Sequence, residues 1–293
     1  MKKLAFSLLA VVLCTSFTVE ADERIRAGVL RFQSSAGIEG GFAAAVSDTF
    51  AQMLGLSEKF SVMSTEQMMM IATQNTIPLA GNISKETAIQ IGKLAKCKYV
   101  IAGTVTSFKR TSKNSGIVIV SSHKEETRAE AEIKVYDTET GKEVMSASDF
   151  GRAAQGGNNI SIYGVSKGSS NLSGMDAGAI SELSSKLTLK VLEKLTGYFP
   201  TVTQKEGKEI TIDLGTMNGA NKGGYYRIYT VSGDEEMNLA VVKVTYATEN
   251  SCKAVRAEKG MGDISLVEEG DKVFPVNAVE LKALKKNGFA QSR

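Results

Sequence analysis

The residue types that most often carry chemistry are few and scattered in this chain. His123 is the single histidine, and its neighbours Ser122, Lys124 and Glu125 are polar, as is typical of a turn between two strands. A catalytic triad needs a base beside a nucleophile, and a zinc site needs three or four N, S or O ligands. One histidine and two separated cysteines of the mature chain, Cys97 and Cys252, meet neither requirement. We therefore expect no catalytic residue, no metal site and no enzyme activity.

Two glycine-rich loops could approach a phosphate, but neither carries a nucleotide-binding motif. Residues 37–41 lie between an expected strand and an expected helix, where a phosphate can meet a helix N-terminus. Their spacing matches neither G-x-G-x-x-G nor the Walker loop. Residues 215–224 lack a Lys-Ser/Thr ending and are typical of a turn between strands. We expect no cofactor, and a periplasmic small-ligand or nucleotide-binding module stays an alternative that depends on residues 37–41.

Two smaller patterns allow more than one interpretation. Cys97 and Cys252 could pair in an oxidising compartment, or each could be a small buried residue. Met68, Met69 and Met70 are consecutive, and on an amphipathic helix such a run favours core packing over soft-metal binding.

The N-terminus predicts export from the cytoplasm. Lys2 and Lys3 precede an apolar run, and residues 19–21, Val-Glu-Ala, suit signal peptidase, so we predict a signal peptide over residues 1–21 that is cleaved after Ala21. An uncleaved anchor and a lipid on Cys14 are alternatives, although Leu13 stands where a lipobox has a small residue. The expected location is the periplasm or the periplasmic face of the outer membrane.

The charge balance argues against nucleic acid as a partner. The chain has 35 Lys and Arg against 32 Asp and Glu, interleaved along its length. A nucleic-acid binder usually shows a basic stripe instead.

The stretch over residues 84–108 predicts a helix that leads directly into a central strand. Ala88, Ile91 and Ala95 recur at helical spacing after Ser84, which can cap the first turn. Residues 100–102 are consecutive and apolar, so this strand should be covered on both faces. Helices packed on such a sheet form an α/β sandwich.

The remaining segments complete a two-part α+β chain. Strands are expected at residues 25–32 and 60–63, helices at 42–54, 64–71 and 175–195, and an antiparallel meander at 116–122, 127–136 and 142–151. These make a mixed α/β sandwich domain over residues 22–200. After a polar linker at 201–209, strand candidates at 209–214, 225–231, 240–247, 251–257 and 272–276 predict a small all-β barrel or sandwich over residues 201–277, followed by a tail at 278–293.

The order of these motifs resembles the CsgG/HfaB-like family of curli production assembly/transport components. The resemblance is carried by IRAGVLRF at residues 25–32, AIQIGKLAKCKYVIAGTVTSF at 88–108 and EIKVYDTETGKEVMSAS at 132–148. Residues 207–276 are similar to the C-terminal domain of the flagellar assembly protein FlgT. The resemblance implies a non-enzymatic assembly or secretion factor of the cell envelope. It would self-associate or dock, through envelope proteins, on a curli-type secretion, flagellar or cell-wall machine.

A ring-forming outer-membrane secretion channel is the alternative within the same family. Membrane-spanning strands need about 9–11 residues that alternate apolar with polar, and residues 117–120 are too short for this. Residues 151–166 could form a hairpin that turns at residues 156–158, in which Ile160, Ile162 and Tyr163 would face lipid or a partner.

Overall fold

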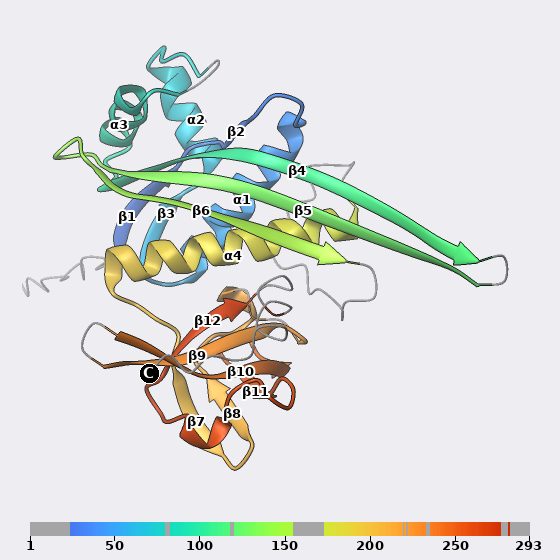
Figure 1. The fold of residues 1–293 in the computed structure, drawn as a ribbon. Helices are drawn as coiled ribbons and strands as arrows, with labels where there is room; N and C mark the ends of the chain where they lie inside the picture. The colour runs from blue at the N-terminus through green and yellow to red at the C-terminus, as the bar shows by residue number, and fades with distance from the viewer. Residues whose placement is uncertain are drawn as a thin grey trace, which may run out of the picture.

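The computed structural model describes residues 24–79, 83–117, 120–154, 173–218, 220, 222–232, 235–276 and 281. Within these residues the chain forms two six-stranded sheets and four α-helices, and the helices all pack on the first sheet (Figure 1). The second sheet follows in sequence, and no α-helix connects its strands in the described residues. The predicted α+β fold class is confirmed.

The first sheet has the strand order β3-β1-β4-β5-β6, with β2 paired to β4 beside the end of β1. Its strands are β1 (Ile25–Val29), β2 (Gln33–Ser34), β3 (Phe60–Met63), β4 (Tyr99–Ile117), β5 (Val120–Asp137) and β6 (Glu143–Ala154). β1 pairs in parallel with β3 and β4, while β4, β5 and β6 form an antiparallel meander. The central place predicted for the strand after residue 99 is therefore confirmed.

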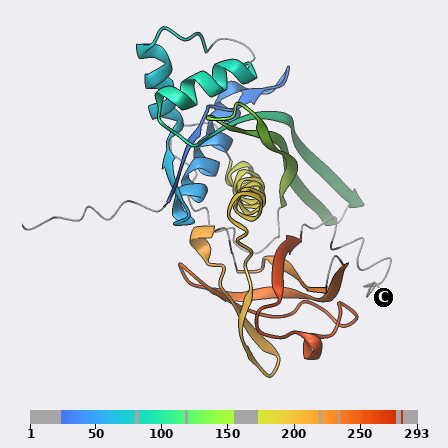
Figure 2. The same ribbon diagram turned by 90° about the vertical axis from the view of Figure 1, so that its left-hand side faces the viewer.

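Helices cover both faces of this sheet (Figure 2). α1 (Gly40–Leu56) and α4 (Gly174–Thr196) pack on one face, where Ile101 and Val105 of β4 are fully buried. α2 (Thr65–Gln74) and α3 (Lys85–Leu94) pack on the other face, against Val100 and Tyr136. The alternation of side chains along β4 and β5 thus feeds two separate apolar layers.

Sequence reasoning divided the β4–β5 region wrongly. Residues 116–122 were expected to be a strand of their own, but β4 continues to Ile117 and pairs with β5 up to the Ile117–Val120 pair. The strands contain 19 and 18 residues, so the expectation of a hairpin too short for a channel is also wrong. Figure 1 shows this hairpin projecting well beyond the helices. The backbone ladder continues through residues that are polar in the sequence, so no apolar alternation indicated a strand there.

The second sheet is antiparallel, with the strand order β12-β9-β10-β11-β8-β7. Its strands are β7 (Val202–Glu206), β8 (Glu209–Ile212), β9 (Tyr225–Ser232), β10 (Glu235–Ala247), β11 (Cys252–Arg256) and β12 (Lys272–Val276), with short 3-10 turns at Thr216–Asn218 and Ile264–Leu266. The sheet is not closed into a barrel, although an isolated bridge joins Thr201 to Lys272.

The residues expected to be a polar linker include strand β7, so that interpretation is wrong. β7 is an edge strand with most of its side chains exposed, and an edge strand needs no apolar face to pair. Apolar residues of both sheets belong to one continuous core, which runs from Phe50 and Leu187 to Ile210 and Val242. Figure 2 looks along α4, which lies between the two sheets. The expected tail lies outside the described residues except for Leu281.

Candidate functional site

Several residues singled out from sequence cannot be placed. Ala21 and the hairpin residues Ile160, Ile162 and Tyr163 lie outside the described residues, so signal cleavage and the second hairpin stay predictions. His123 belongs to β5 and pairs with Asn114 across the β4–β5 ladder. It is therefore in a strand, and the turn expected around it is wrong.

Both described cysteines are buried and free, so the suggested Cys97–Cys252 pair does not form. Cys97 lies just before β4, and Cys252 begins β11. Burial raises the pKa of the Cys97 thiol, and it raises that of Cys252 to about 12. At neutral pH both thiols are protonated and are poor nucleophiles.

The described residues include no group of three or more His, Cys, Asp or Glu side chains placed to hold a metal ion. Among the helices that the structure describes, none is long and apolar enough to cross a membrane.

The methionine run and the first glycine loop have structural roles. Met68 is fully buried against Gly28, whereas Met70 is 59% exposed, so core packing accounts for only part of the run. The glycine loop leads into α1, and Glu39 is the N-cap residue just before this helix. A carboxylate at that place opposes the phosphate that a nucleotide would bring.

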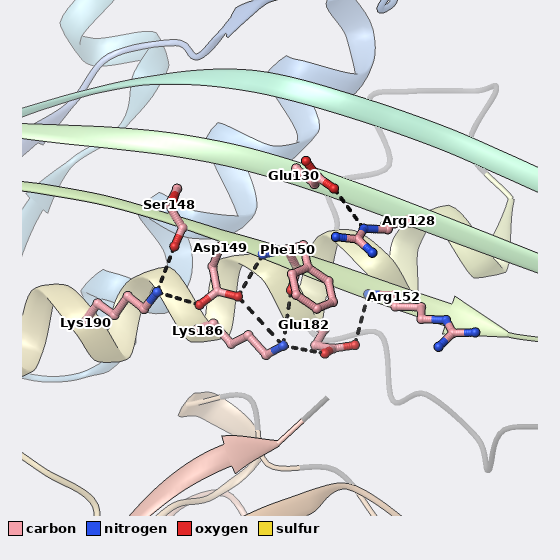
Figure 3. A network of polar contacts seen from close by, with 9 residues as sticks. All are labelled: Arg128, Glu130, Ser148, Asp149, Phe150, Arg152, Glu182, Lys186 and Lys190. Carbon is pink, nitrogen blue, oxygen red and sulfur yellow. Dashed lines mark hydrogen bonds and ion pairs between the residues drawn. The ribbon is translucent and has the colours of Figure 1, made fainter. Parts of the chain in front are cut away.

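A network of charged side chains joins α4 to the edge strand β6 (Figure 3). Lys186 is only 2% exposed, and its Nζ lies 2.8 Å from Glu182 Oε1 and 3.9 Å from Asp149 Oδ1. One turn further along the helix, Lys190 Nζ lies 2.7 Å from Asp149 Oδ2. Lys186 Nζ also lies 4.8 Å from the centre of the Phe150 ring. Two lysines and two carboxylates therefore compensate one another where helix and strand meet.

The same side chains form hydrogen bonds with backbone groups of β6 at the edge of the sheet. Lys186 donates to the Phe150 carbonyl at 3.2 Å, and Lys190 donates to the Ser148 carbonyl at 2.8 Å. The backbone N–H of Arg152 donates to Glu182 Oε2 at 3.0 Å. An open sheet edge is a template on which another strand can add. Over these residues α4 blocks that template, so we assign the network a structural role rather than a catalytic one.

A second ion pair, between the half-exposed Arg110 and the buried Asp176, anchors the base of the projecting hairpin. Asp176 lies in the first turn of α4 and is fully buried, and its carboxylate accepts two hydrogen bonds from Arg110 of β4, at 3.0 and 2.7 Å. Thr127 of β5 donates a third at 3.1 Å. Burial raises the pKa of Asp176, but the bonds from Arg110 and Ser173 outweigh it, so the pKa lies below its ordinary value. The carboxylate stays charged and ties α4 to both strands.

A polar cleft of about 610 Å³ lies on the α3 side of the sheet. Residues of β4 and β5 form its floor, and β2 with the following turn and the start of α3 form its walls. The lining residues are Arg31, Gln33, Ser34, Ser35, Ala36, Ile83, Lys85, Ala102, Gly103, Thr104, Glu132, Lys134 and Tyr136. Their charges are three cations and one carboxylate.

Sequence reasoning missed both the network and the cleft. Arg31, Lys85 and Lys134 are each one basic residue among many, about fifty positions apart. The strand pairing of Ala102 with Lys134 and the start of α3 bring them to one hollow. The spacing of Glu182, Lys186 and Lys190 on one helix face was the only sequence signal.

One family of known proteins matches more than half of this chain. A model of the family described as curli production assembly/transport component CsgG matches residues 13–211. A search of curated proteins finds no match.

Three of the similar solved structures are 15–17% identical to this chain. The lipoprotein GNA1162 from Neisseria meningitidis is 17% identical, covering 46% of this chain and 87% of its own, with a TM-score of 0.37. The hypothetical protein CT253 from Chlamydia trachomatis is 16% identical, covering 60% and 99%, with a TM-score of 0.39. PelC from Paraburkholderia phytofirmans, solved as a dodecamer, is 15% identical, covering 59% and 88%, with a TM-score of 0.33.

Proposed function

This chain belongs to the CsgG family of curli production assembly/transport components, and we propose that it is a non-enzymatic assembly or secretion factor of the cell envelope. The family match carries this proposal, because residues 13–211 include the whole first sheet and all its described helices. The chain would be exported, cleaved after Ala21, and would act in the periplasm or at the periplasmic face of the outer membrane. Its partners would be envelope proteins or further copies of itself.

The described surfaces support association through docking rather than through strand addition at β6. The side chains of α4 occupy the backbone of β6 over residues 148–152. The β4–β5 hairpin, in contrast, projects from the body (Figure 1). The Arg110–Asp176 pair holds its base. We propose that this hairpin contacts a neighbouring subunit or a larger envelope machine. The similarity of residues 207–276 to the C-terminal domain of the flagellar assembly protein FlgT supports the same proposal, that the chain docks on an envelope machine.

The hairpin sequence favours a docking arm over a channel wall. A strand that faces lipid needs an apolar residue at every second position. Beyond Phe108, the residues of β4 are Lys, Arg, Thr, Ser, Lys, Asn, Ser and Gly before the final Ile117, and their partners in β5 are equally polar. A membrane-spanning role would therefore rest on residues 151–166.

The proposal is tested by extracting native envelopes first with salt and then with detergent, and by measuring the size of the released protein. A photoreactive amino acid at Thr111, which is exposed just beyond the Arg110 anchor of the hairpin, should crosslink the chain to a partner or a second copy. The same replacement at Lys208, which is exposed in the turn between β7 and β8, is the matched control and should give no product. Release as a monomer without crosslinks would contradict the proposal. Release by detergent alone, as a large ring, would favour the secretion channel.

A further inference from the structure

We propose that the polar cleft over β4 and β5 binds an extended acidic peptide segment of an envelope partner. The inference deepens the proposed function and rests on it, because it names the kind of partner that docks. The cleft is called the basic cleft below, and its charged residues are Arg31, Lys85, Lys134 and Glu132.

The charges of the basic cleft are only partly paired within the described chain, although a backbone hydrogen bond and, to a lesser extent, the charge of Lys85 lower the pKa of the adjacent exposed Glu86. Lys134 Nζ lies 3.5 Å from Glu132 Oε1, and this pair compensates itself. Arg31 and Lys85 are exposed, and neither forms an ion pair with a carboxylate of the described residues. Two like charges that share a hollow repel each other, and an anionic ligand between them removes this repulsion. The unpaired cations therefore select for carboxylate or another anion.

Neutral groups on the same walls fit a peptide backbone. The Ser34 hydroxyl is buried and has no hydrogen-bond partner among the described residues, although Ser34 lines the cleft. Thr104 on the floor adds a second hydroxyl. Hydroxyl groups can donate to a carbonyl and accept from an N–H, so the Thr104 hydroxyl can bond a peptide laid across the sheet, and the Ser34 hydroxyl can do so once its side chain rotates toward the cleft.

A second hollow extends the basic cleft toward α2. It has a volume of about 360 Å³, shares Arg31 with the cleft, and is lined by Met69 and Met70 together with the polar residues Glu66, Thr73 and Gln74. Met70 is 59% exposed, which is unusual for a large apolar side chain. Flexible methionine side chains adapt to varied apolar ligands. A ligand that fits both hollows would place carboxylates in the basic cleft and an apolar side chain against the methionines. An amphipathic acidic peptide has both kinds of side chain. A small free anion would use neither the length nor the methionines.

The test uses fluorescence anisotropy with the purified mature protein and a fluorescein-labelled peptide of alternating Glu and Leu. The peptide should bind, and a version with Gln in place of Glu should bind at least about tenfold more weakly. Arg31→Glu and Lys85→Glu should each weaken binding by about tenfold or more, because each replaces an attraction with a repulsion. Lys208→Glu, an equal charge reversal on the second sheet, should leave the affinity unchanged.

Four results would overturn the inference. The Gln peptide could bind equally well, the cleft variants could bind like the unmodified protein, or inorganic phosphate at the peptide's own concentration could displace it. Arg31 and Lys85 are exposed and form no ion pair with the residues that the structure describes, so their variants should fold, and unchanged melting temperatures would establish this. No binding of the peptide would also refute the inference. If peptide binding fails but the photoreactive hairpin still crosslinks to envelope proteins in cells, the proposed assembly role is retained and only the peptide inference is refuted.

Discussion

Replacing Lys186 by Met tests whether the α4 network holds the edge of the first sheet. Methionine keeps an unbranched apolar chain in a site where Lys186 is 2% exposed, and it removes the ammonium group. Glu182 then loses a partner at 2.8 Å, and the Phe150 carbonyl loses a donor at 3.2 Å. Two opposing effects follow, because the variant also avoids the cost of burying a charge.

The magnitudes favour a net loss of stability. A hydrogen bond to a charged group contributes about 1.5–3 kcal/mol, and an unsatisfied buried carbonyl costs about 1–3 kcal/mol. Breaking one side of a buried ion pair costs about 3–5 kcal/mol. Here the loss is smaller, because Lys190 still pairs with Asp149 and the Arg152 N–H still bonds Glu182. We expect the free energy of unfolding to fall by about 2–3 kcal/mol, which corresponds to a melting temperature lower by about 5–10 °C.

Urea denaturation followed by circular dichroism measures this change. Lys190→Met is the matched control, since Lys190 lies one turn away and is 28% exposed, and its cost should stay below about 1 kcal/mol. Adding Glu182→Gln to Lys186→Met should restore about 1 kcal/mol by removing the stranded charge. A Lys186→Met protein within about 0.5 kcal/mol of the unmodified protein would refute the account of a stabilising network.

The other predictions concern three buried positions. Asp176→Asn should cost about 2 kcal/mol at neutral pH, because it weakens the bonds to Arg110. The pKa of Asp176 is lowered in the folded state, so this stabilisation is present above the unfolded pKa and is lost as the pH falls through the folded value. The urea midpoints of both proteins should therefore converge below about pH 4. Gly151→Ala should cost more than about 3 kcal/mol, since a Cβ would lie 1.9 Å from the Ala179 carbonyl oxygen of α4. Iodoacetamide at pH 8 should label Cys252 only after unfolding, because burial raises its pKa to about 12; mass spectrometry reads the label.

Each of these has its own contrary result. Gly174→Ala is the control for Gly151→Ala, because a Cβ there would meet nothing within 4 Å, and it should leave stability nearly unchanged. Equal stability of both glycine variants would mean that α4 does not contact β6 as described. An Asp176→Asn protein that stays weaker than the unmodified protein in acid would contradict the assigned titration. Rapid labelling of folded Cys252 would show that its strand opens readily.

Local patterns in the sequence were sufficient for much of the first sheet. Apolar residues at helical spacing placed the helices, and the consecutive run at residues 100–102 placed β4 at the centre. Ala129, Ala131, Ile133 and Val135 alternate with charged residues, and all four are buried. Patterns of this kind are readable because burial on one face is repeated at the period of the element.

Polar strands could not be recognised in the same way. The β4–β5 hairpin beyond Phe108 and the edge strand β7 have no apolar face over most of their length. Such strands form because a neighbouring strand satisfies their backbone groups, and that neighbour is set by register. For this reason the extended hairpin was mistaken for a strand with a turn at His123.

The sequence by itself determined the α+β class, the central strand and the resemblance to an envelope family. Only the tertiary structure decided which charges meet. Lys186 is buried because β6 lies directly on α4, and Arg31, Lys85 and Lys134 share a cleft because three distant segments converge on one sheet face. A side chain's partners depend on through-space distances, whereas a sequence shows only separations along the chain. The charged residues therefore come together at the edge of β6 and in the basic cleft only because the strands pair and the helices pack on the sheet.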